Sequence, residues 1–194
     1  MAKGKAKSRS KAKPAKKAAK RAAPKRAAYK LGPHAKGGKG IPPGFATLTA
    51  HLVVEGAANA MDFYKRAFGA EEIGRAPMPD GKKLMHGLLK VGNSMLMLVD
   101  SFPEFGAKGP KELGGSAVTL HVYVTDADKA FQRAVDAGCS VAIPMADMFW
   151  GDRYGKVKDP FGHEWSIATK IKDLSPEEME AAQKAAFAAE KPQV

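Results

Sequence analysis

Hydrophobic and polar positions follow the same order twice along this chain. Residues 48–70 read LTAHLVVEGAANAMDFYKRAFGA, and residues 118–139 read VTLHVYVTDADKAFQRAVDAGC. In each segment, apolar residues at alternating positions predict a short strand, and apolar residues three and four apart then predict an amphipathic helix that a glycine ends. The two segments lie seventy residues apart. A repeat of this size predicts two copies of one supersecondary unit.

Further strand-like segments complete each unit. The turn sequences PDG and GN separate three alternating segments after the first helix, and three more follow the second helix. The predicted strands are 48–54, 71–79, 82–91, 94–100, 117–124, 139–143, 153–158 and 163–169. The fold class is therefore α+β, with two tandem βαβββ modules at residues 46–100 and 117–172 joined by a loop. Neither module buries much surface alone, so we expect the two to pack together.

The C-terminal segment, residues 173–194, predicts one more helix. Ser175 is the expected N-cap, Pro176 occupies the first helical position, and Glu178 completes a capping box. We expect its apolar side chains to pack on the domain or on a second subunit.

Several stretches of residues 46–172, about two thirds of the chain, carry a family resemblance: DFYKRAFGA, PMPDGKKLMHGLLKVGNSMLML, LGGSAVTLHVYV and GDRYGKVKDPFGHEW. Together they resemble the glyoxalase/bleomycin-resistance/extradiol-dioxygenase (vicinal oxygen chelate) superfamily, and within it the PhnB-like branch. The resemblance implies that the modules form a partly open, sheet-lined cavity and that the chain forms a homodimer. It implies either a small-molecule-binding protein of the bleomycin-resistance type or an enzyme with lyase, dioxygenase or transferase-like activity.

Strand alternation selects the residues that face this cavity. One face of each predicted strand is apolar and belongs under a helix, so the opposite face is left for the cavity wall. The residues expected on that wall are Thr49, His51, Thr119, His121, Tyr123, Glu164 and Ser166. Their hydroxyl, imidazole and carboxylate groups suit hydrogen-bonded recognition of a polar ligand. If the protein is an enzyme, His51, His121 and Glu164 are the candidate acid–base groups.

A predicted loop provides a lid for the cavity. The sequence MADMFWGD places Phe149 and Trp150 where they can enclose a planar or apolar ligand, and Arg153 follows as a partner for an anion. The alternative is a hydrophobic cover without a ligand.

The resemblance also raises the question of a metal. Metal-dependent relatives have ligands at positions that align here with Thr49, Leu96, Thr119 and Ser166. Hydroxyl groups are poor ligands for transition metals, and a leucine side chain cannot bind a metal at all. We therefore expect no metal and no other cofactor. The alternative is a divalent metal on a displaced set, formed by His51, His121 and Glu164, which matches the two-histidine, one-carboxylate pattern.

Charge divides the chain into two parts. It has 32 Lys and Arg against 20 Asp and Glu, and residues 1–40 hold 15 of the basic residues and no acidic one, so the remainder has a balance of 17 − 20 = −3. The composition of residues 1–45 therefore predicts a disordered Lys/Ala-rich tail followed by a Gly/Pro linker. The tail is similar in composition to linker-histone tails. Such a tail can bind DNA or RNA without sequence preference; a solvated tail with no partner is the alternative.

The single cysteine, Cys139, excludes an internal disulfide and favours a reducing compartment. We expect it to be a small buried apolar residue. No apolar run is long enough to span a bilayer, and the N-terminus lacks the apolar core of a signal peptide. We therefore predict no membrane partner and a cytoplasmic location, associated with the nucleoid if the tail binds DNA.

Overall fold

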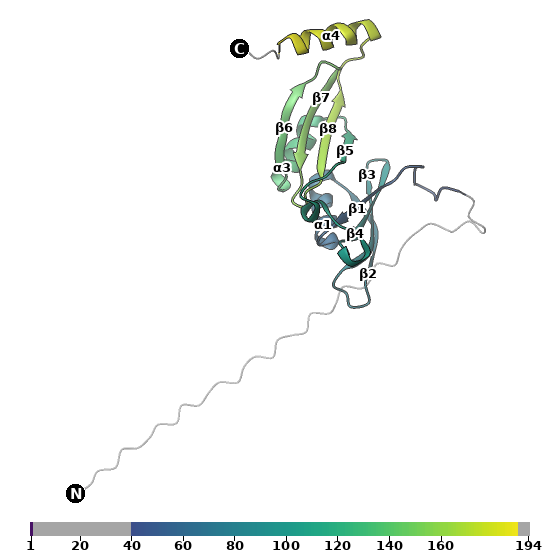
Figure 1. The fold of residues 1–194 in the computed structure, drawn as a ribbon, viewed down its shortest axis with the longest axis vertical. Coiled ribbons are helices and arrows are strands. Elements are labelled where there is room, and N and C mark those ends of the chain that lie inside the picture. Colours follow the sequence, from purple (N-terminus) through teal and green to yellow (C-terminus); the bar gives the residue numbers. More distant parts are fainter. Residues whose placement is uncertain (2–39, 190–194) are drawn as a thin grey trace.

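The computed structural model describes Met1 and residues 40–189, and the predicted basic tail otherwise lies outside the described residues. Two four-stranded sheets with helices follow each other along the long axis of the molecule (Figure 1). The first module contains β1 (Ala50–Val54), α1 (Ala57–Phe68), β2 (Glu71–Pro77), β3 (Leu84–Val91) and β4 (Ser94–Asp100). The second contains β5 (Thr119–Tyr123), α3 (Ala127–Ala137), β6 (Ser140–Asp147), β7 (Asp152–Lys158) and β8 (Glu164–Lys170). The predicted α+β fold of two βαβββ modules is confirmed.

Both sheets have the same topology. Their strand orders are β1-β4-β3-β2 and β5-β8-β7-β6, so the first strand of each module pairs in parallel with the last. The other pairings are antiparallel, as short turns between consecutive strands require. Strands β1 and β5 are consequently sheet edges.

The two modules share one hydrophobic core. Helix α1 packs against α3, and their apolar faces cover one face of each sheet. The ring of Phe68 from α1 stacks on Trp165 from β8 at a centroid distance of 4.2 Å, and Tyr64 contacts the same indole. Apolar alternation on β1 and β8 therefore points toward the helices, as predicted.

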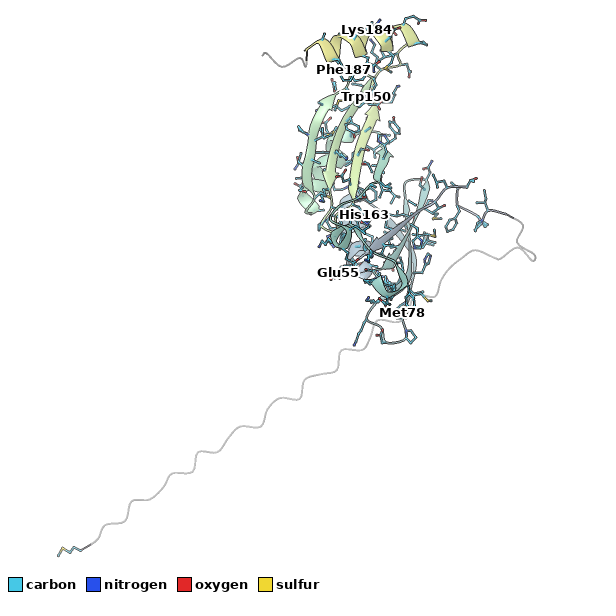
Figure 2. The ribbon with its side chains drawn as sticks, viewed as in Figure 1. Glu55, Met78, Trp150, His163, Lys184 and Phe187 are labelled. Carbon is cyan, nitrogen blue, oxygen red and sulfur yellow. The ribbon has the colours of Figure 1, made fainter. Side chains whose placement is uncertain are left out.

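A buried carboxylate connects the modules at this core. Asp159, in the turn between β7 and β8, accepts hydrogen bonds from the Tyr64 hydroxyl at 2.7 Å and from the Trp165 indole at 2.9 Å. Its second oxygen accepts from the backbone N–H groups of Phe161 and His163. His163 is itself buried and lies, through Nε2, 3.3 Å from the carbonyl oxygen of Val53 in the other module (Figure 2). The turn therefore fastens module two to module one.

Three segments differ from the sequence-based prediction. β6 continues through Pro144 to Asp147, where a loop was expected, because an edge strand tolerates a residue that cannot donate to the ladder. The connecting loop contains the short helices η1 (Pro103–Phe105) and α2 (Pro110–Leu113). The third difference is at Leu96, which aligned with a metal-ligand position but is buried in the core on the helix side of the sheet.

Helix α4 (Pro176–Ala189) lies beyond the second sheet (Figure 1). The predicted capping box is present, since Ser175 Oγ accepts from the Glu178 backbone and the Glu178 carboxylate accepts from the Ser175 backbone. Within residues 40–189, no helix is long and apolar enough to cross a membrane.

Candidate functional site

The second sheet has one face without a helix, and most of the predicted wall residues lie on it. We call this surface the open face of the second sheet. Cross-strand pairing aligns Thr119 with Glu164 and His121 with Ser166, so the predicted alternation places all four on one side. Trp165 and Ile167 are buried on the other side. The side chains of Thr119, His121 and Tyr123 are exposed, which is consistent with a face that no helix within residues 40–189 covers.

Aromatic rings are connected across the open face. The His121 imidazole lies edge-on to Tyr123 at 4.5 Å between centroids and nearly parallel to Tyr154 of β7 at 6.2 Å. Trp150 contacts Tyr154 edge-on at 5.6 Å. Four rings from β5, β7 and the turn before β7 thus form a continuous aromatic surface, which can accommodate a planar ligand.

Polar groups accompany these rings. His121 Nδ1 lies 2.7 Å from the hydroxyl of Ser166, a hydrogen bond that orients the imidazole. The Glu164 carboxylate pairs with the Lys156 ammonium group, and the Thr119 hydroxyl lies 3.5 Å from it. The hydrogen bond from Lys156 lowers the pKa of Glu164, so this residue remains a charged acceptor rather than a proton donor near neutral pH.

Asp152 lies at the end of the open face, where β7 begins. One of its oxygens, Oδ2, accepts hydrogen bonds from the Tyr123 hydroxyl and the Trp150 indole, each at 3.1 Å. The bond to Asp152 raises the pKa of Tyr123, which therefore stays a hydroxyl donor. Asp152 is only 3% exposed, although Tyr123 above it is 63% exposed.

The first sheet has an open face of its own, and it carries the remaining predicted residues. His51 is exposed on β1 and contacts the His86 ring edge-on at 6.0 Å. Burial, and then the neighbouring His51, lower the pKa of His86. Thr49 donates its hydroxyl to the carbonyl of Ala46. In the described part of the chain His51 shares no hydrogen bond or ring contact with His121, so the predicted residues form two groups, one on each sheet.

These donors do not fit a metal. Among the described residues, no three His, Cys, Asp or Glu side chains lie close enough together to hold an ion. Glu164 is held by Lys156, and the Nδ1 atom of His121 is used by Ser166. Leu96, which aligned with a ligand position, is buried on the helix side, so the open face at this point carries Met95 and Met97 instead. Thioethers are soft ligands and do not replace a carboxylate.

Two predicted ligand-binding residues lie away from the aromatic surface. Arg153 alternates to the helix side and pairs with Asp128 of α3 at 2.7 Å and with Asp147 at 3.1 Å. These two carboxylates raise its pKa further. The ring of Phe149 lies 6.1 Å from that of Phe187 on α4. There it lines a hollow of about 410 Å³ between the turn and α4.

Three residues of the open face were absent from the predicted set: Asp152, Tyr154 and Lys156. Each alternates with a residue of the helix side along β7. Tyr154 and Lys156 lie within the predicted strand 153–158, whose alternation already separates them from Arg153. Asp152 lay in the predicted loop and joins this face because β7 begins one residue earlier. Cys139 is buried as expected, and burial raises the pKa of its thiol to about 12, which makes it a poor nucleophile.

Known proteins share this architecture. A curated protein of Mycobacterium tuberculosis, described as uncharacterised, is 49% identical over 138 residues, covering 70% of this chain and 81% of its own length. An uncharacterised Arabidopsis thaliana protein is 35% identical over 147 residues, covering 70% of this chain and 86% of that protein.

Solved structures agree in fold. The X-ray structure of an Arabidopsis thaliana gene product has a TM-score of 0.52 at 31% identity, over 64% of this chain and 98% of that one. TioX from Micromonospora sp. ML1 has a TM-score of 0.52 at 24% identity, over 65% and 99% of the two chains. A Bacillus cereus PhnB protein has a TM-score of 0.50 at 18% identity, over 64% of this chain and 99% of that one.

The model of the Glyoxalase/Bleomycin resistance protein/Dioxygenase superfamily matches residues 45–167. With two βαβββ modules and this match over more than half its length, the chain belongs to that superfamily.

Proposed function

We propose that this protein binds a small, planar organic molecule on the open face of the second sheet, without a metal. The observation that carries the proposal is the connected aromatic surface of His121, Tyr123, Trp150 and Tyr154, which stands beside fixed polar groups. Rings supply contact area at low entropic cost, and the hydroxyls and carboxylates orient the ligand. The enzymatic alternative is disfavoured, because Glu164 is paired with Lys156 and does not contact His121.

Native mass spectrometry of freshly purified protein tests this proposal by finding a retained small molecule. Replacing Tyr154 by Ala should weaken binding of that molecule about tenfold, because one ring contact contributes roughly 0.5–1.5 kcal/mol beyond area burial. Treatment with EDTA should leave binding unchanged, because the donors present do not suit a metal. Phe105→Ala is the matched control, since this exposed ring lies in the connecting loop. Binding that survives Tyr154→Ala, or that requires one metal ion per chain, contradicts the proposal.

We further propose that a second copy of the chain completes the site. Each open face is one wall, and the edge strands β1 and β5 are available for pairing. Val118, just before β5, is 64% exposed, and Leu48, before β1, is 90% exposed. A second chain can cover these apolar edges and bring the His51 wall opposite the His121 wall.

The expected assembly is a dimer at micromolar concentration, of twice the 20.6 kDa chain mass. Val118→Lys should shift sedimentation toward the monomer, because a charge on an edge strand opposes pairing. Val141→Lys, on the opposite edge strand β6, is the control and should leave the dimer intact. A wild-type monomer, or equal effects of the two lysines, would refute the arrangement.

We also propose that residues 1–40 bind nucleic acid without sequence preference. The supporting observation is charge: 15 basic residues and no acidic one in this segment, against a balance of −3 in the remainder. A polycation of this density releases counterions from phosphates and requires no folded surface.

A further inference from the structure

Three aspartates of the described chain are almost completely buried, and they differ in how their oxygens are used. Asp100 accepts hydrogen bonds from the backbone of Gly56 and Ala57 with one oxygen and from the backbone of Leu84 with the other. Both oxygens of Asp159 accept two hydrogen bonds each. These two carboxylates are structural, because every oxygen has a partner within the fold.

Asp152 is the exception. Its Oδ2 atom has the Tyr123 and Trp150 donors, but Oδ1 is buried and has no hydrogen-bond partner within the described residues. None of the ion pairs in that part of the chain includes Asp152. Leaving a charged oxygen buried without a partner costs free energy that a folded protein ordinarily avoids. A carboxylate with two neutral donors and an idle oxygen is suited to receive a further, positively charged donor.

The surroundings of Asp152 indicate where that donor enters. Tyr123 is 63% exposed, so its ring can turn outward at little cost and its hydroxyl can be replaced by a donor on the ligand. Such a turn would free the position of the Tyr123 hydroxyl on Oδ2 for a donor that approaches from the open face. Trp150 keeps the N–H edge of its indole on Oδ2, and the Tyr154 ring contacts that indole edge-on, so the entering group meets the same aromatic surface that is proposed to bind the ligand.

We propose that the ligand of this site carries a planar cationic group with N–H donors, of the amidinium or guanidinium type, which pairs with both oxygens of Asp152 in place of the Tyr123 hydroxyl. The inference rests on the proposed function, because it specifies the ligand class of the same open face. A planar fork of N–H groups matches the two carboxylate oxygens and supplies the hydrogen bond that Oδ1 lacks.

The test uses three probes of nearly equal shape: benzamidine, which is cationic, benzamide, which is neutral, and benzoate, which is anionic. Their dissociation constants are measured by NMR titration of the full-length protein. Wild-type protein should bind benzamidine at least tenfold more tightly than benzamide, a difference of about 1.4 kcal/mol, and benzoate least well. Equal binding of benzamidine and benzamide would overturn the proposal.

Variants assign the preference to Asp152. Asp152→Asn keeps an acceptor for Tyr123 and Trp150 but loses the charge, so the preference for benzamidine should disappear. Asp147→Asn removes a charge from the same end of the sheet, where it pairs with Arg153 on the helix side, and should keep the preference. Tyr123→Phe removes the competing hydroxyl and should bind benzamidine at least as tightly as wild type, which keeps the test valid if Asp152→Asn does not fold.

The outcomes separate this inference from the proposed function. If Tyr154→Ala weakens all three probes while Asp152→Asn leaves their order unchanged, the open face is a binding site and the charge preference is wrong. If no probe and no retained molecule binds, the proposed function fails together with the inference. A preference for benzamidine that survives in Asp152→Asn, or is lost in Tyr123→Phe, also overturns the inference.

Discussion

Full-length protein should bind duplex DNA at 50 mM salt. If six to ten of its tail cations contact phosphates, its affinity should fall roughly 10³- to 10⁵-fold between 50 and 200 mM salt. A chain that starts at Gly44 should not bind at either salt concentration, because all 15 cations of residues 1–40 are removed and the remainder has a balance of −3. Salt-titrated gel shifts with both forms measure this difference. It is the largest effect we expect for this protein.

The control for tail length is a full-length variant in which the Lys and Arg residues of positions 1–40 are replaced by Gln. It should behave like the truncated chain, because the proposed binding depends on charge alone. Equal binding by full-length and truncated protein would show that the folded domain binds DNA. Failure of the full-length chain to bind at 50 mM salt would refute the proposal for the tail.

Asp159→Ala should destabilise the fold by more than about 4 kcal/mol, since buried donors left without a partner cost roughly 1–3 kcal/mol each. The substitution removes the acceptor of the Tyr64 hydroxyl, the Trp165 indole and two backbone N–H groups. Burial, and then the negative charge of Asp159, raise the pKa of Tyr64. Burial persists in the variant, so the hydroxyl stays protonated and is left as a buried donor without its acceptor. For a chain of this size we expect Tm to fall by about 10 °C or more.

Urea denaturation at fixed protein concentration measures the loss, since dimerisation would make stability depend on concentration. Asp136→Ala is the matched control, because this exposed aspartate accepts from Gln132 on the same helix and from no other group in residues 40–189, so its loss should cost less than about 0.5 kcal/mol. An Asp159→Ala protein that melts within 2 °C of wild type would show that the turn does not hold the modules together.

Local patterns were enough to place many of the side chains described here. The alternation of Thr119, His121 and Tyr123 predicted their common face, and the structure confirms it, because successive side chains on a strand must point to opposite sides of the sheet. The capping box of Ser175 and Glu178 was also predictable, because it is a local pattern of two residues three positions apart at the start of a helix. The seventy-residue repeat predicted two equivalent modules.

Where a strand begins was less predictable. Because β7 begins at Asp152 and not at Arg153, Asp152 joins Tyr154 and Lys156 on the open face, opposite to Arg153, which pairs with Asp128 of α3. Pro144 suggested that β6 ends early, yet the strand continues because it lies at the sheet edge and its pairing with β7 is interrupted between Ile143 and Ala146, where Pro144 has no ladder partner. Edge position is a property of the sheet and is not written in the local sequence.

By itself, the sequence determined the repeat, the class of fold and the alternation of the strands, because these depend on covalent geometry and on neighbours a few residues away. Only the tertiary structure decided which distant groups meet. Tyr64 reaches Asp159 across 95 residues, and Trp150 and Tyr123 converge on Asp152 from different elements. Such contacts depend on how α1 and α3 pack between the modules, which no periodicity encodes. The difference between a structural aspartate at 159 and an incompletely bonded one at 152 was therefore decided by packing alone.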